Sequence, residues 1–226
     1  MEEGGKFLGE IILHFDKLNW FNISNNKICN KGAIYLFQAF KESLSSFTNN
    51  TFPYMDIIDT AININSNNMY NNIPSSSLNI TNNNSINNLN SNKLYHNIET
   101  LILYNIGIYS EECLKLLGDI LTNPFCGIKS LVLSQNNLGS IPSVNNIDVK
   151  NLNNTKYFLE CLQKNKSVTE LILLNCQIGN EVTEEIYNML NYNRSIEYLV
   201  LYNNKINNQE TFVKLLSLFS DFGDKN

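Results

Sequence analysis

The sequence predicts an α/β solenoid, a single domain of stacked strand–helix units spanning residues 1–226. Two observations carry this prediction. First, residues 98–108, 128–138, 168–178 and 196–206 superpose without gaps on the pattern apolar-x-x-L-x-L-x-x-(N/C/I)-x-(I/L). Second, the spacing of apolar residues changes from 2 within these copies to 3.6 between them, as expected for a strand followed by a helix. One such unit cannot bury its strand and its helix alone, so the units are predicted to stack.

Two further copies lie closer to the N-terminus. Residues 18–28 fit the pattern, and residues 59–69 fit it with Asp59 breaking the first apolar position. Together the copies give about six repeats. The shortest interval, from Leu171 to Leu199, is 28 residues, so the longer intervals contain insertions. We expect the first leucine positions of the copies to lie side by side in one parallel sheet, because parallel strands need crossover connections such as helices.

The segments between the copies have helical spacing. Apolar faces are predicted at residues 32–44, 111–121, 157–162 and 182–190, and in the last helix at Phe212, Leu215, Leu216 and Phe219. The sequence FLGEII at residues 7–12 is similar to LLGDIL at 116–121. Residues 1–17 are therefore predicted to form the helix of an incomplete first repeat.

Three insertions interrupt the repeats. Residues 70–97 are rich in Asn and Ser and have low complexity, which predicts a surface loop followed by a poor helix at about 85–95. Residues 140–151 are predicted as a second loop between strand and helix, and 47–57 as a third between helix and strand. They are interpreted either as tolerated surface insertions or, for the two strand-to-helix loops, as projections that help to hold a partner.

The repeated motif resembles the ribonuclease-inhibitor-like class of leucine-rich repeats over residues 7–222. That class also includes the Ran GTPase-activating proteins, tropomodulin and the sensor domains of NOD-like receptors. The resemblance implies a horseshoe arc with the parallel sheet on its concave face and helices on its convex face. It also implies a turn-bonding side chain at one repeat position. Asn fills that position at Asn26, Asn67, Asn136 and Asn204, Cys176 is a usual substitute, and Ile106 departs from the pattern.

Composition excludes several classes of partner. The chain has a net charge of −5 with 16 % charged residues, and Arg194 is its only arginine, so no nucleic-acid partner is expected. The acidic start and spaced apolar residues of 1–15 do not form a signal peptide, and no apolar run long enough for a membrane span occurs. Five cysteines without CxxC spacing indicate reduced, mostly buried thiols in the cytoplasm or the nucleus.

Catalytic and cofactor motifs do not emerge from the sequence, so we expect a noncatalytic protein without cofactor or metal. His14 and His96 have no Cys, Asp or Glu at metal-ligand spacing and are interpreted as surface residues. The glutamates near 111 and 181 are placed at helix starts, where they favour the helix dipole. Cys29 follows the first strand, and a reactive thiolate there is the minor interpretation. The N-x-S sequons at Asn165 and Asn193 are interpreted as chance matches.

The side chains that flank the leucines of each strand are predicted to form the binding surface on the concave face. From the 98–108 copy onward they are apolar and partly aromatic, as in protein interaction sites. Strand propensity alone is the alternative explanation for Ile and Val at these positions. The predicted protein-binding residues are Trp20, Ile102, Tyr104, Val132, Ile172, Leu174, Tyr198, Val200 and Tyr202.

These expectations favour a protein-binding scaffold or adaptor in the cytoplasm, either a monomer or a fragment of a larger chain. Two alternatives rest on the resemblance: a GTPase-activating or other enzyme-regulating protein, in which Arg194 would face a GTPase, and a cytoskeletal or axonemal structural component.

Overall fold

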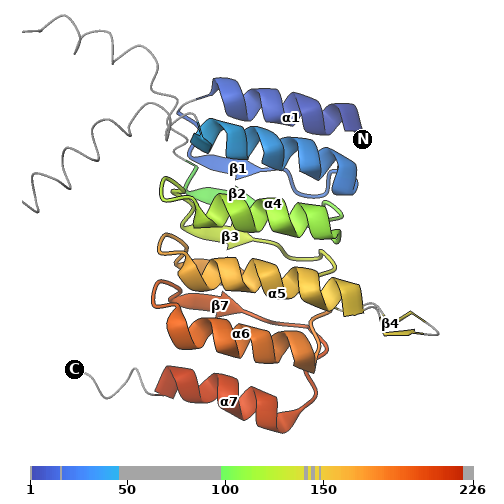
Figure 1. The fold of residues 1–226 in the computed structure, drawn as a ribbon, viewed down its shortest axis with the longest axis vertical. Coiled ribbons are helices and arrows are strands. Elements are labelled where there is room, and N and C mark those ends of the chain that lie inside the picture. Colours follow the sequence, from blue (N-terminus) through green and yellow to red (C-terminus); the bar gives the residue numbers. More distant parts are fainter. Residues whose placement is uncertain are drawn as a thin grey trace, which may run out of the picture.

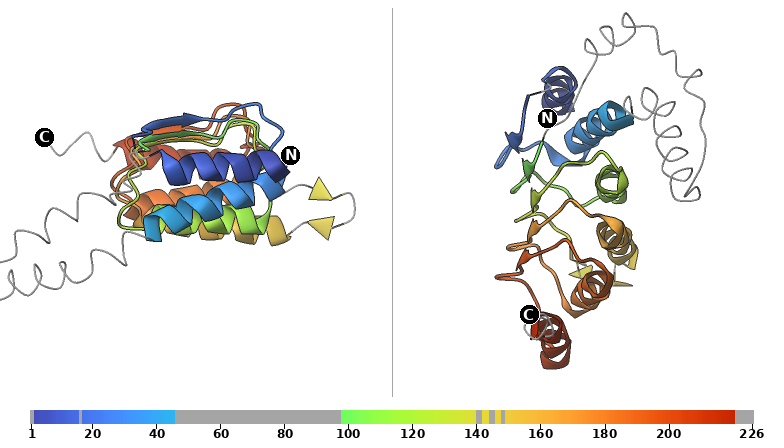
Figure 2. Two further views of the ribbon diagram at one scale, coloured as in Figure 1. Left: turned by 90° about the horizontal axis from the view of Figure 1, so that it is seen from above. Right: turned by 90° about the vertical axis from the view of Figure 1, so that its left-hand side faces the viewer.

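A computed structural model describes residues 2–15, 17–45, 98–139, 142–143, 146–147 and 149–220 of the chain. Its fold is α/β, with a parallel sheet covered by helices on one side (Figures 1 and 2). Strands of this sheet and helices alternate along the described chain. A small pair of strands lies between the third strand of the sheet and the helix that follows it, and the helices after the second, third and fourth strands each return the chain to the start of the next strand of the sheet.

The sheet has five parallel strands among the described residues, in the order β1-β2-β3-β6-β7. Each has three residues: β1 (Trp20–Asn22), β2 (Thr100–Ile102), β3 (Ser130–Val132), β6 (Glu170–Ile172) and β7 (Tyr198–Val200). Their central residues pair in one register, which runs through Phe21, Leu101, Leu131, Leu171 and Leu199. The prediction that these positions lie side by side in one parallel sheet is confirmed.

The helices form one layer behind the sheet (Figure 2, right). They are α1 (Glu2–His14), a helix over residues 29–45, α4 (Glu111–Thr122), α5 (Val149–Lys164), α6 (Asn180–Tyr192) and α7 (Gln209–Ser220). Ser110 caps α4 through its side chain, which accepts a bond from the Cys113 N–H, and Glu111 and Glu112 follow in the first turn. The two glutamates predicted at a helix start near residue 111 therefore lie at the positive end of the helix dipole, where a carboxylate is stabilising.

The core lies between the sheet and the helix layer. Leu101, Leu131 and Leu171 are at most 1 % exposed. The leucines that directly follow these strands are buried just as deeply: Leu103, Leu133 and Leu173. These side chains pack against the buried faces of the helices in one continuous cluster. The predicted face of the last helix is partly wrong: Leu215 is buried, but Phe212 and Leu216 are 47 % and 50 % exposed because no further helix covers them in the described chain.

Asparagine side chains join the strand-to-helix turns of neighbouring units. The Oδ1 atom of buried Asn136 accepts hydrogen bonds from the N–H groups of Gly107 and Ile108, at 3.1 and 3.0 Å. Its Nδ2 donates to the carbonyls of Leu103 and Leu133, at 2.7 and 2.9 Å. Asn204 makes a similar set of four bonds two junctions later, where it accepts from the N–H groups of Cys176 and Ile178 and donates to the carbonyls of Leu173 and Leu201. The turn-bonding role expected of these asparagines is thus present in the structure.

A second set of asparagines closes the helix-to-strand turns. The Oδ1 atom of Asn165 accepts from the N–H of Val168 at 2.7 Å, and its Nδ2 donates to the carbonyl of Leu121 in the preceding unit, also at 2.7 Å. Asn193 bonds in the same way to Ile196 and Leu162. Both asparagines are at most 6 % exposed. The asparagines of these two sequons therefore have a structural role, because their side-chain amide nitrogens are buried and already donate hydrogen bonds to backbone carbonyls.

The insertions differ from the simplest expectation. β1 pairs directly with β2, so the place predicted for a strand at residues 59–69 is filled by this pairing. That copy, with Asn67, and the loops at 47–57 and 70–97, with His96, lie outside the described residues. Within 140–151, β4 (Pro142–Ser143) and β5 (Asn146–Ile147) form a small antiparallel pair. Residues 149–151, predicted as loop, are the first turn of α5.

Candidate functional site

The candidate site is the face of the sheet opposite the helix layer. Leu101, Leu131 and Leu171 point into the core, so the residues on either side of each point to the other face. Three rows of side chains cross the strands there. The first row is Trp20, Thr100, Ser130, Glu170 and Tyr198. The second is Asn22, Ile102, Val132, Ile172 and Val200.

The third row follows the strand ends and contains Tyr104, Ser134, Leu174 and Tyr202. Backbone bonds continue the pairing here: the N–H of Asn105 donates to the Ser134 carbonyl at 2.9 Å, and that of Asn175 to the Tyr202 carbonyl at 3.1 Å. Ser134 does not contribute to the surface, because it is 1 % exposed and its hydroxyl accepts from the Leu174 N–H at 3.1 Å. Tyr104 and Leu174 are half-buried beside it.

The apolar part of this face is continuous at the C-terminal strands. Ile172 and Val200 pair across β6 and β7 and are half-buried, while Tyr198 and Tyr202 are 56 % and 75 % exposed. Ile102 and Val132 extend the same row toward β1. Eight of the nine predicted binding residues therefore lie on neighbouring strands or on the turns that follow them. We call these eight the sheet-face patch: Ile102, Tyr104, Val132, Ile172, Leu174, Tyr198, Val200 and Tyr202.

Trp20 is the predicted binding residue that the structure separates from the others. It is 54 % exposed on β1, at the opposite edge of the sheet from Tyr198. The polar side chains of Thr100, Ser130 and Glu170 lie between the two in the first row. Trp20 is on the predicted face but not in the apolar patch.

Glu170 and Glu197 are surface residues that the apolar pattern did not select. Glu170 is next to Tyr198 in the register and accepts a hydrogen bond from the Ser130 hydroxyl. Glu197 directly precedes β7 and is exposed. The sequence feature that could have identified them is their position beside Tyr198: Glu197 precedes it in the chain, and Glu170 is opposite it on the neighbouring predicted strand.

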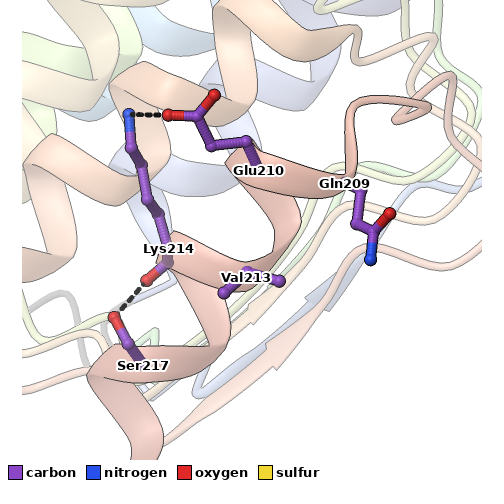
Figure 3. A pocket seen from close by; sticks show the side chains of 5 residues that line it. All are labelled: Gln209, Glu210, Val213, Lys214 and Ser217. Atoms are coloured by element: carbon purple, nitrogen blue, oxygen red, sulfur yellow. Dashed lines mark hydrogen bonds and ion pairs between the residues drawn. The ribbon is translucent and has the colours of Figure 1, made fainter.

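Two hollows of the described chain lie on the helices, away from this face. One lies along α7 and is lined by Gln209, Glu210, Val213, Lys214 and Ser217 (Figure 3). There the Lys214 ammonium is 3.6 Å from the Glu210 carboxylate, and the Ser217 hydroxyl donates to the Lys214 carbonyl. These are exposed contacts within one helix, and they hold no pair of groups arranged for chemistry.

A second hollow, at the ends of α5 and α6, gathers Lys164, Lys166 and Arg194. The Arg194 guanidinium donates to the carbonyl of Leu190 at 3.0 Å, at the end of α6. Cations at a helix C-terminus balance the negative end of the helix dipole. This geometry accounts for the only arginine of the chain by helix capping.

Titratable groups gather once more on the helix layer. Asp119 of α4 accepts from Lys41 Nζ at 2.6 Å and from the Tyr157 hydroxyl of α5 at 2.8 Å. Burial by itself would raise the pKa of Asp119, but the two hydrogen bonds outweigh it and hold that pKa below its usual value. The bond to Asp119 raises the pKa of Tyr157 above its ordinary value. The triad links three helices.

The buried cysteines are poor nucleophiles. Burial raises the pKa of Cys113 to about 11 and that of Cys176 to about 12, so both are thiols at neutral pH. Cys29 is half-buried. Among the described residues no group of three or more His, Cys, Asp or Glu side chains is placed to hold a metal ion. His14 ends α1, where its ring bonds the Glu10 carbonyl.

The sequence matches no protein-family model and no curated protein. Within the described part of the chain, none of the helices combines the length and apolar character that a membrane crossing requires.

Proposed function

We propose that the chain is a leucine-rich-repeat solenoid of the ribonuclease-inhibitor-like class and acts as a noncatalytic scaffold or adaptor that binds another protein. The repeat of 28 residues, the shared register of the leucines and the asparagine bonds between turns support the class. The sheet face would then be the concave surface of an arc. We further propose the cytoplasm as its compartment.

One observation carries the binding proposal: the sheet-face patch leaves large apolar and aromatic side chains exposed on adjacent strands. Tyr198 and Tyr202 are more than half exposed, beside Ile172, Leu174 and Val200. Covering such a surface with a partner stabilises the complex by about 25 cal/mol for each Å² of apolar area removed from water. Tyrosine suits such a surface because its ring buries a large area and its hydroxyl retains a polar contact.

The test compares two pairs of exposed tyrosines. The variant Tyr198→Ser/Tyr202→Ser removes the aromatic part of the patch, and Tyr109→Ser/Tyr192→Ser makes the same change away from it, at residues that are 50 % and 71 % exposed. Tagged versions of the 226-residue chain are compared by quantitative affinity purification, with circular dichroism to verify the fold. We expect the first variant alone to lose bound proteins. Equal recovery with both variants would refute the sheet face as the binding surface.

A further inference from the structure

Charge is distributed unevenly along the edge of the sheet where the strands begin. Near β2 and β3, Glu99 and Lys129 form an ion pair at 2.8 Å and neutralise each other. Near β6 and β7, Glu170 and Glu197 are both acidic, and within the described residues neither has a cationic group at ion-pair distance. Two carboxylates therefore remain uncompensated at the C-terminal part of the face.

Tyr198 lies beside both carboxylates. It pairs with Glu170 across the two strands, and Glu197 is its neighbour in the chain. Adjacent strands are about 4.8 Å apart, so a cation over the Tyr198 ring would be within reach of the Glu170 carboxylate, and Glu197 adds a second negative charge at the preceding position of the chain. The exposed ring attracts a cation through its π face, and the carboxylates accept its hydrogen bonds. The Ser130 hydroxyl already holds one oxygen of Glu170, which limits the rotamers of that side chain.

Apolar rows follow this acidic corner at regular distances along the strands. Ile172 and Val200 are two residues farther, at about 6.6 Å, and Leu174 and Tyr202 follow four residues farther, in the turns after the strands, at no more than about 13 Å. An α-helix advances about 6 Å in four residues and about 12 Å in eight. A helix lying along the strands can therefore place one side chain on the acidic corner and two more on the apolar rows.

We propose that the occupant of the sheet face is an amphipathic helix with an arginine or lysine at the Glu170–Tyr198–Glu197 corner and apolar residues one and two turns away. This inference rests on the proposed protein-binding function and specifies its partner chemistry. An acidic segment would be repelled at the same corner. A purely apolar helix would leave two carboxylates facing it without a partner, at a desolvation cost.

The experiment selects helical peptides from a displayed library with one randomised face, using the whole chain as bait. Enriched peptides are labelled, and their affinities are measured by fluorescence anisotropy. We expect Arg or Lys at a fixed spacing from apolar residues. The variant Glu170→Gln/Glu197→Gln should weaken binding about tenfold, and rising salt should weaken it further. The control Glu160→Gln/Glu181→Gln makes the same charge change at exposed sites on the helix layer and should leave the affinity unchanged.

A charge exchange gives the sharpest result. Peptides in which the basic residue is replaced by Glu should regain affinity for the variant Glu170→Lys/Glu197→Lys. Peptides without basic residues that lose binding on Tyr198→Ser/Tyr202→Ser but tolerate Glu170→Gln/Glu197→Gln would overturn the helix chemistry and leave the proposed function standing. If substitutions at all four positions left peptide binding unchanged, or if no peptide were enriched, the result would count against both the helix chemistry and the proposed function.

Discussion

The two ends of the sheet have the same sequence pattern but different surroundings. At the β1 end, Phe21 and Ile23 are only 7 % and 4 % exposed, and α1 contributes Ile12 to the same core. At the β7 end, Leu199 and Leu201 occupy equivalent positions but are only partly buried. The exposed faces of Phe212 and Leu216 on α7 belong to this end as well.

This difference shows that burial in the fold comes from the neighbouring unit. Leu171 and Leu199 are paired in the register, yet Leu171 is 0 % exposed because β7 and α6 continue beyond it. Stability should therefore decrease from the inner units toward the β7 end, as in arrays where each unit contacts only its neighbours. Substitutions at equivalent positions measure this gradient.

The largest effect is expected for the leucine column. Leu171→Ala leaves a cavity in a closely packed core and should lower the free energy of unfolding by about 3–4 kcal/mol. Leu199→Ala removes the same atoms from a partly solvated position and should cost about 1–2 kcal/mol. Urea unfolding followed by circular dichroism measures both. Equal losses would contradict the gradient, because they would require equal burial at both positions.

The asparagine turns provide the second comparison. Asn136 is 2 % exposed and makes four hydrogen bonds to two units, so Asn136→Ala leaves several buried backbone groups without partners. We expect a loss of about 2–3 kcal/mol. Asn26, the equivalent residue of the first unit, is exposed and bonds only its own turn in the described structure. Asn26→Ala should cost less than about 1 kcal/mol in the same urea experiment. A larger loss at Asn26 would indicate a further contact there.

Much of the fold could be predicted from periodicity, and the inner strands show why. Leu101, Leu131 and Leu171 alternate with outward residues in identical spacing, and side-chain direction alternates strictly along a strand. Their register follows from the copies alone. The match at residues 59–69 lies outside the described residues, and the direct pairing of β1 with β2 leaves no place for a strand between these two. Periodicity was also partly wrong at α7, because an amphipathic pattern does not show whether another helix covers its apolar face, and the described residues include none there.

The candidate site was predictable in its apolar part and less so in its polar part. Ile172 and Val200 had to face outward once Leu171 and Leu199 faced inward. The burial of Ser134 depends on a hydroxyl that bonds the next turn, which spacing does not reveal. Glu170 and Glu197 became notable only when the strands were compared: Lys129 pairs with Glu99, whereas no cation among the described residues pairs with these two.

The β1 end can be tested at two adjacent glycines of α1. A Cβ atom added to Gly5 would lie 2.2 Å from the carbonyl oxygen of Gly32 in the next helix, so Gly5→Ala must push α1 away. We expect a loss of about 1–3 kcal/mol and greater exposure of Phe21. Gly4 has nothing within 4 Å of the same position. Gly4→Ala should instead stabilise the helix by about 0.5 kcal/mol. Thermal unfolding of both variants measures these changes in stability. Similar losses of stability in the two variants would show that the position of α1 does not depend on this close contact.

The smallest effect concerns charge on the helix layer. Asp119 has a lowered pKa in the folded chain, so its contribution to stability is present above the unfolded pKa of about 4 and is lost as pH falls through the folded value. Asp119→Asn should cost about 0.5–1 kcal/mol at pH 7, a surface-like magnitude, and this difference from the unsubstituted chain should shrink below about pH 4. Glu210→Gln disrupts only an exposed pair with Lys214 on α7, and it should leave stability unchanged. Urea titrations across this pH range measure both. A difference at Asp119 that persists in acid would assign its role to packing between the inner helices, because protonation removes the charge but not the contact.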